Sequence, residues 1–154
     1  MNQSKVKELL EEALSENESL FLIDLSFLSD NKIKVIVDGD EGVSLKECIR
    51  ISRNIEHNLD REEEDFSLEV TSPDISHSLV MKRQYKKNLG RILKVKTEND
   101  SFEGVLAEVN ENEIVLKWKA REPKPIGKGK VTVEKEQLLS YTEIKEAKVK
   151  IIFN

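Results

Sequence analysis

Cysteine and histidine are scarce, with one and two copies respectively among 154 residues. The lone Cys48 excludes an internal disulfide and a zinc site built from several cysteines. Histidine, aspartate and glutamate do not cluster at metal-ligand spacing, and the glycine-rich phosphate-binding motifs are missing. These absences argue against an enzyme, and we expect no catalytic residues, no metal and no cofactor.

Long apolar runs are also missing. None approaches the roughly twenty residues that a membrane-spanning helix needs. The N-terminus continues into the charged segment KVKELLEE instead of a secretory leader. We therefore expect a cytoplasmic protein with no membrane contact.

The net charge of −5 hides two halves of opposite sign. Residues 1–80 hold eight Lys or Arg against nineteen Asp or Glu, whereas residues 81–154 hold seventeen against eleven. Such a division favours a basic protein as partner of the first half and nucleic acid as partner of the second. The alternative is charge that only keeps both halves in solution. We predict an acidic α/β domain at 1–80 and a basic domain at 81–154.

The first half predicts the order α-β-β-α-β. A helix is expected from Ser4 to about Asn17, followed by strands at 20–28, 32–38 and 66–71. Ser44 and Glu47 form a capping box that begins a second helix. The apolar face of this helix is predicted to bury Cys48 together with Leu45, Ile49, Ser52, Ile55 and Leu59.

The second half is predicted to be mostly β. After a short helix ended by Gly90, strands are expected at 91–97, 101–109, 113–119 and 147–153. Gly104 inside a strand indicates a bend or bulge. Short strands with tight turns favour a small five-stranded SH3-like or Sm-like β-barrel, which makes the whole chain α+β.

Residues 119–130 break the strand pattern with two prolines and two glycines. We expect a long, mobile basic loop or an open hairpin here. Residues 131–140 either extend that hairpin or hold the fourth strand. Trp118, between two lysines, fits stacking on a base or packing beneath the loop, and packing is favoured.

Lysine and arginine gather in two clusters, a pattern typical of salt-sensitive contact with phosphate. The first cluster is Lys82, Arg83, Lys86, Lys87, Arg91, Lys94 and Lys96. The second is Lys117, Lys119, Arg121, Lys124, Lys128 and Lys130.

The order of these parts resembles the bacterial ribosome maturation factor RimP family, over nearly the whole chain. The sharpest match is LEVTSP (68–73). The other matching segments are FLIDLSF (21–27), VIVD (35–38), GVSLKECIRISRNIEHNL (42–59), RQYKKNLGR (83–91), KVK (94–96), FEGVL (102–106), EIVL (113–116) and YTEIKEAKVKIIF (141–153).

The resemblance implies an α/β domain followed by an SH3-like barrel. It also implies a non-catalytic assembly factor that binds immature small (30S) ribosomal subunits, promotes their maturation and contacts small-subunit protein number twelve. We expect a monomer. The alternative is a free-standing Sm-like RNA-binding regulator, which would form rings or dimers.

The candidate sites follow from this resemblance combined with the charges. Ser72, Pro73 and Asp74 are expected to form the inter-domain turn, while His77 stands where the family commonly has arginine. The residues expected to contact a ribosomal protein are Asp40, Glu41, Glu62, Glu63 and Glu64. Those expected to contact ribosomal RNA are Lys86, Lys87, Lys117, Lys119, Arg121, Lys124, Lys128 and Lys130.

Overall fold

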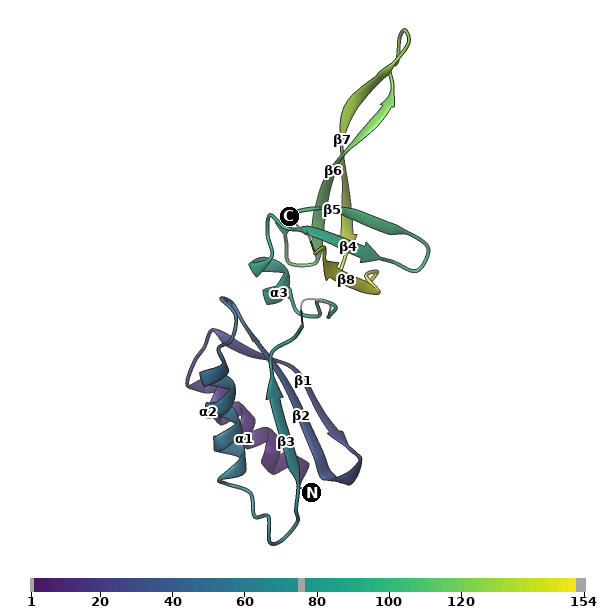
Figure 1. Ribbon diagram of the computed structural model, residues 1–154. Coiled ribbons are helices and arrows are strands. Elements are labelled where there is room, and N and C mark those ends of the chain that lie inside the picture. Colours follow the sequence, from purple (N-terminus) through teal and green to yellow (C-terminus); the bar gives the residue numbers. More distant parts are fainter. Residues whose placement is uncertain (1, 75–76, 152–154) are drawn as a thin grey trace. The chain divides into compact units, whose positions relative to one another are not determined.

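The computed structural model describes residues 2–74 and 77–151 and divides the chain into two compact units, Met1–Asp74 and Ile75–Asn154 (Figure 1). The division predicted from the sequence lies later, after residue 80. Leu79 accounts for the difference, because its N–H donates to the Ala147 carbonyl at 2.7 Å and its side chain packs against the second core. The residues just before the short helix therefore belong to the second unit.

The first unit has the predicted order α-β-β-α-β. Strand β2 pairs antiparallel with β1 and parallel with β3, and α2 makes the crossover that parallel pairing requires. Both helices lie on one face of the three-stranded sheet (Figure 1). The elements are α1 (Gln3–Ser15), β1 (Leu20–Leu28), a 3₁₀ turn (Ser29–Asn31), β2 (Lys32–Gly39), α2 (Leu45–Glu56) and β3 (Ser67–Thr71).

Helix α1 begins one residue before the predicted Ser4. The Asn2 side chain accepts a hydrogen bond from the Lys5 N–H at 3.1 Å and so caps the helix. Buried α1 residues recur at helical spacing and meet the helix-covered face of the sheet. They are Val6, Leu9, Leu10 and Ala13.

The buried face of α2 differs from the prediction. Cys48 and Ile55 are buried as expected, but Ile51 is fully buried, whereas Leu45 is 76% and Ile49 is 42% exposed. Two apolar stripes run along this helix, and periodicity alone does not rank them. Packing against α1 and the sheet selects the stripe that contains Ile51 and Ile55.

Ser44 caps α2 as predicted, with its hydroxyl oxygen accepting from the Glu47 N–H at 3.1 Å. The second half of the expected capping box is wrong. The Glu47 carboxylate bonds Arg50 and Asn17 instead of returning to the start of the helix.

The second unit is a five-stranded antiparallel sheet in the order β7-β6-β5-β4-β8, preceded by a short helix. In the part of the chain that the structure describes, no pairing joins β7 to β8, so the sheet is established and a closed barrel is not. The elements are α3 (Lys82–Lys87), β4 (Ile92–Lys96), β5 (Ser101–Val109), β6 (Glu113–Pro123), β7 (Lys130–Ser140) and β8 (Glu146–Val149). The predicted last strand extended to 153, and its residues 152–153 lie outside the described part.

Gly104 marks a close approach of two strands, and of the predicted bend or bulge, the bulge is wrong. A Cβ at this position would lie 2.8 Å from the Lys117 carbonyl oxygen and 3.2 Å from Cε3 of Trp118. The register irregularity of β5 falls instead between Leu106 and Glu108. The absent side chain leaves room for the Trp118 ring above the sheet.

Strands β6 and β7 form a long hairpin, the second of the two alternatives expected for residues 119–130. Their pairing runs without interruption from Glu113 opposite Ser140 to Pro123 opposite Lys130. Of the two alternatives for residues 131–140, both hold, because β7 is the fourth strand and also extends the hairpin. Strand β5 pairs with β6 only as far as Lys117, so the hairpin continues beyond the sheet (Figure 1).

Candidate binding surfaces

We call residues 118–135 the distal hairpin, because these parts of β6 and β7 pair only with each other. Directly opposed residues share a face of a two-stranded ribbon, and successive residues alternate between faces. One face therefore carries the predicted RNA-contacting residues Lys119 and Arg121, opposed by Glu134 and Thr132. The other face carries Trp118, Ala120, Glu122, Val131, Val133 and Lys135.

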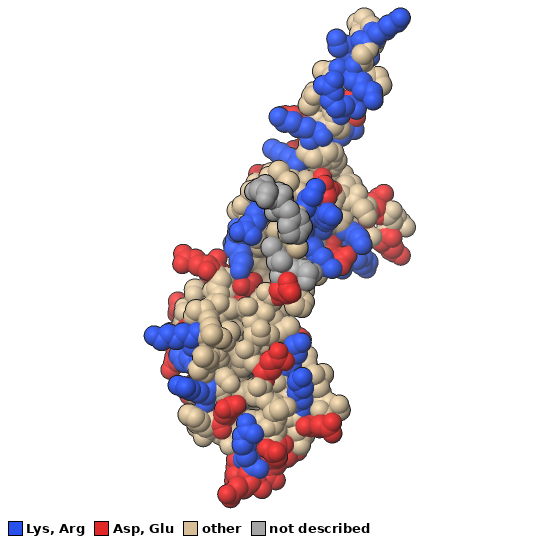
Figure 2. All heavy atoms as spheres, viewed as in Figure 1, with Lys and Arg blue, Asp and Glu red and all other residues tan. Residues whose placement is uncertain are grey.

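Positive charge on this hairpin is largely unneutralised. Figure 2 shows lysine and arginine gathered along it. Lys117 lies 4.0 Å from Glu136 at the base, and Lys135 pairs with Glu122. Four of the predicted residues make no ion pair with any residue that the structure describes. They are Lys119, Lys124, Lys128 and Lys130.

Arg121 is held in place by its neighbours on β7. Its guanidinium donates to the Thr132 hydroxyl at 3.1 Å and to the Lys130 carbonyl at 3.5 Å. Both partners are uncharged, so the full positive charge stays available to a ligand. A guanidinium oriented in this way suits phosphate, which its planar fork matches.

The tip of the hairpin, residues 124–129, combines basic and apolar character. The Lys124 N–H donates to the Gly129 carbonyl at 3.1 Å and closes the turn. Gly127 and Gly129 have φ of +87° and +97°, which an L side chain rarely adopts. Ile126 is 89% exposed and lies between two of the unpaired lysines.

Trp118 packs in the way that the sequence favoured. Its ring lies 6.3 Å from that of Phe102, centroid to centroid, and it packs against the second core. One side of the residue still borders an open hollow of about 710 Å³ at the base of the hairpin. The other lining residues are Val105, Lys117, Lys119, Glu134, Lys135 and Glu136.

The remaining predicted RNA-contacting residues, Lys86 and Lys87, are exposed in the last turn of α3. Cations in this position also interact favourably with the helix dipole. Helix α3 lies beside the sheet and away from the hairpin tip (Figure 1). The basic candidates therefore occupy two separate places on the second unit.

The acidic candidates are likewise divided between opposite ends of the first unit. Asp40 and Glu41 follow the last residue of β2, whereas Glu62, Glu63 and Glu64 precede β3. Because β2 and β3 are parallel and Lys32 pairs with Ser67, the two groups are separated by the length of β2, about 25 Å. They cannot form one acidic patch.

The group at residues 62–64 has further carboxylates beside it. Asp60 and Asp65 flank it in the chain, and the Asn31 side chain of the β1–β2 turn donates to the Asp65 carbonyl at 3.2 Å, which brings Asp30 to the same end. Arg61 pairs with Glu56 at 3.5 Å and Asp65 at 3.3 Å. Arg61 and Lys32, the first residue of β2, do not balance the carboxylates of this end.

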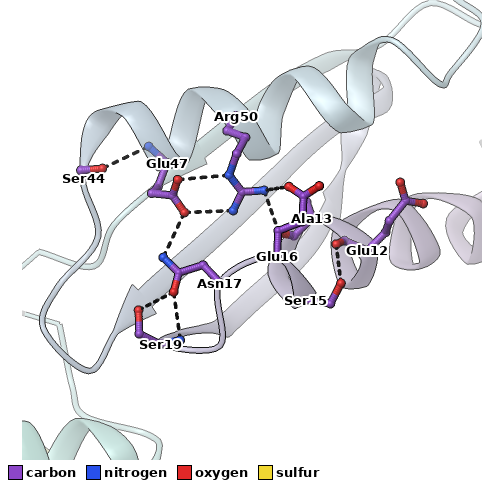
Figure 3. Close-up of polar contacts among 9 residues, drawn as sticks. All are labelled: Glu12, Ala13, Ser15, Glu16, Asn17, Ser19, Ser44, Glu47 and Arg50. Carbon is purple, nitrogen blue, oxygen red and sulfur yellow. Dashed lines mark hydrogen bonds and ion pairs between the residues drawn. The ribbon is translucent and has the colours of Figure 1, made fainter.

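At the opposite end, Arg50 joins the two helices (Figure 3). Its guanidinium bonds both Glu47 carboxylate oxygens, at 3.1 and 2.9 Å, and donates to the Ala13 carbonyl at 2.8 Å and to Glu16. The bond from Arg50 holds the pKa of the Glu47 carboxyl below its usual range. Asn17 donates to the same carboxylate at 3.3 Å. These polar groups are engaged in structure, in contrast to the hairpin lysines.

Ser72, Pro73 and Asp74 lie between the end of β3 and the division of the two units. Ser72 and Asp74 are exposed and Pro73 is half-buried. His77, which stands where the family that the sequence resembles commonly has arginine, is exposed in the second unit.

Two groups buried in the units have raised pKa values. Burial raises the pKa of the Cys48 thiol, and burial together with neighbouring Tyr141 raises that of Tyr85 to about 12. Within residues 2–74 and 77–151, no three histidine, cysteine or acidic side chains gather as metal ligands would. The same residues include no helix with the length and apolarity to cross a bilayer.

Fold and surfaces together define an α+β protein of two units, with a basic β-hairpin on the second. A family model of the RimP N-terminal domain matches residues 9–76. A relative from Christiangramia forsetii is 65% identical over 99% of this chain and all of its own length. Relatives from Flavobacterium psychrophilum and Cytophaga hutchinsonii are 54% and 31% identical, over 98% and 97% of this chain and 98% and 96% of their own. Each carries the name ribosome maturation factor RimP.

The chain therefore belongs to the ribosome maturation factor RimP family. This confirms the resemblance drawn from the sequence.

Proposed function

We propose that this protein binds immature small (30S) ribosomal subunits in the cytoplasm and promotes their maturation without chemistry of its own. Membership of the RimP family supports a role in ribosome assembly. The observation that carries the binding mode is the distal hairpin, whose unpaired lysines present charge to phosphate. Charge of this kind gives fast, salt-sensitive and sequence-indifferent attachment to RNA.

The two units take different partners in this proposal. In this proposal the second unit is an SH3-like domain that directs its hairpin lysines and Arg121 to ribosomal RNA, with Lys86 and Lys87 as a separate contact. The first unit contacts a basic ribosomal protein, small-subunit protein number twelve in the family resemblance. Opposite charges on the two units would orient the factor during encounter more than they would add affinity.

Among the acidic candidates, the end with Glu62, Glu63 and Glu64 is the stronger docking surface. It adds Asp30, Asp60 and Asp65 within one region, against Arg61 and Lys32. At the end with Asp40 and Glu41, the carboxylates of the adjoining helices, Glu16 and Glu47, are already paired with Arg50.

Co-sedimentation tests the proposal directly. The purified protein is mixed with small subunits from cells that lack it and with mature small subunits, across a salt series. Preferential binding to the immature particle, weakening as salt rises, is the expected result. Equal affinity for both particles would refute the maturation role, and rings or dimers in light scattering would favour the Sm-like regulator.

A fourfold variant assigns the charge dependence to the hairpin. Replacing Lys119, Arg121, Lys124 and Lys128 with Ala should weaken binding and reduce the slope of log affinity against log salt, by about 0.7–0.9 for each phosphate that the variant no longer neutralises. Lys5→Gln with Lys7→Gln, two exposed α1 residues, serves as a charge-removing control. An unchanged slope in the fourfold variant would remove the hairpin from the RNA contact.

A further inference from the structure

We infer that the distal hairpin enters an RNA-lined crevice of the immature subunit, with Ile126 lodged against unstacked bases and its lysines on the surrounding phosphates. The inference rests on the proposed function and deepens it by assigning separate roles to the tip and the shaft of one element.

The reach of the hairpin is the first argument. Six residue pairs, from Trp118 opposite Lys135 to Pro123 opposite Lys130, lie beyond the last pairing with β5. At about 3.3 Å per residue they extend the ribbon by nearly 20 Å before the turn itself. A projection of this length reaches the interior of a crevice that a rounded domain surface cannot enter.

The missing support of the ribbon is the second argument. None of residues 119–138 belongs to the second core or packs against it. An isolated two-stranded ribbon is marginally stable in water, so a ligand that covers its faces would also stabilise it. Strands β6 and β7 pair over eleven residues each, whereas β5 pairs with β6 only as far as Lys117.

The charge distribution changes along the ribbon. Near the base, Lys117 and Lys119 are opposed by Glu136 and Glu134. From Arg121 onward the same face has no carboxylate, and Lys124, Lys128 and Lys130 follow. Positive charge therefore increases toward the tip, which is the direction of insertion between phosphates.

Ile126 gives the tip a second kind of contact. Its side chain is 89% exposed at the point of the turn, between Lys124 and Lys128. Apolar side chains inserted between bases are a known device of proteins that bind nucleic acid by shape. A-form RNA has too narrow a major groove to admit a ribbon. The expected target is a junction, bulge or unpaired segment, which an immature particle leaves accessible.

Cross-linking from the tip identifies the partner. Ile126 is replaced by a photoreactive benzoylphenylalanine, the variant is irradiated on immature small subunits, and linked RNA and protein are separated. We expect cross-links to ribosomal RNA at unpaired positions of the immature particle, and none from the mature one. Cross-links to ribosomal protein alone would overturn the assignment to RNA.

Separate variants distinguish the two roles. Ile126→Ser should weaken binding to immature subunits about tenfold, the cost of losing one buried aliphatic side chain, with the salt slope unchanged. Lys124→Gln with Lys128→Gln should lower the slope by about 1.4–1.8. Leu138→Ser, which changes a 48% exposed residue of β7 opposite Val115 within the sheet, is the matched control for Ile126.

The outcomes separate this inference from the proposed function. If the Ile126 variant binds immature subunits as tightly as the wild-type protein does, the role of the tip is refuted and the maturation function still stands. Absence of binding by the wild-type protein would refute the function itself. Circular dichroism of each variant confirms that any loss does not come from unfolding.

Discussion

The Arg50 bonds between α1 and α2 lead to a prediction for the stability of the first unit alone. Arg50→Met keeps most of the side-chain stem and removes the guanidinium. The variant loses the bonds to Glu47, to Glu16 and to the Ala13 carbonyl near the end of α1 (Figure 3). These interactions differ in value because their exposure differs.

The largest contribution is the charged hydrogen bond to the Ala13 carbonyl, about 1.5 kcal/mol. The pair with Glu47, one turn apart on α2, contributes about 0.5 kcal/mol, and Glu16, with a 65% exposed side chain, contributes close to none. The expected loss in the free energy of unfolding is therefore about 2 kcal/mol. With a urea dependence near 1 kcal/mol per molar for a unit of this size, the midpoint falls by about 2 M.

The single tryptophan provides an internal control. Trp118 lies in the second unit, so its fluorescence follows that unit, whereas far-UV circular dichroism also follows the helices of the first. Arg50→Met should shift the circular dichroism transition of the helices and leave the fluorescence transition in place. Arg53→Met, at an exposed α2 position without an ion pair to any described residue, should change neither.

The pH dependence gives a second check on Arg50. The folded-state pKa of Glu47 is lowered, so the stabilisation from its pair with Arg50 is complete above the unfolded value near 4.5 and is lost as pH falls through the lowered value. The stability gap between wild type and Arg50→Met should therefore narrow from pH 7 to pH 3. A gap that stays constant over this range, or a midpoint shift below about 0.5 M, would refute the reasoning.

Three further outcomes are expected. Gly104→Ala should destabilise the second unit by about 1–3 kcal/mol, seen by tryptophan fluorescence, because the new Cβ meets the Lys117 carbonyl oxygen at 2.8 Å; an unchanged midpoint would show that the strands separate freely. Absorbance titration should find Tyr85 ionising near pH 12. Because its folded pKa lies above the unfolded value of about 10, its contribution to stability is complete below pH 10 and is lost as pH rises toward 12. Tyr85→Phe should remove this part of the alkaline destabilisation. Trypsin should cut first after Lys128 at the exposed tip, as mass spectrometry would detect, since Pro125 blocks the bond after Lys124; first cleavage within α1 would contradict the tip's exposure.

The element order of the first unit could be predicted from local signals, because alternation, helical spacing and the Ser44 cap each act within a few residues. The buried face of α2 could not. Leu45 and Ile49 form as good an apolar stripe as Ile51 and Ile55, and only packing against α1 and the sheet distinguishes them. Tertiary packing decided between two patterns of equal local quality.

The sequence indicated which residues make up the candidate surfaces, but not how these residues lie relative to one another within each unit. The hairpin lysines were identified by composition, and an open hairpin was one of two expectations, but local patterns did not predict the register that places Lys119 and Arg121 on one face. The acidic groups at residues 40–41 and 62–64 both suited a basic partner. Their separation depends on the parallel pairing of β2 with β3, a long-range interaction that no local pattern reports.

The independence of the distal hairpin from the core has a consequence for how the family can vary. Since no core residue lies between 119 and 138, pairs can be added to or removed from the ribbon with little effect on the stability of the sheet. Side chains alternate with a period of two, so adding one residue to each strand would turn the tip to the opposite face. Two residues per strand would restore its direction and extend the reach by about 7 Å. Lengths of this hairpin should therefore differ among relatives in steps of about four residues.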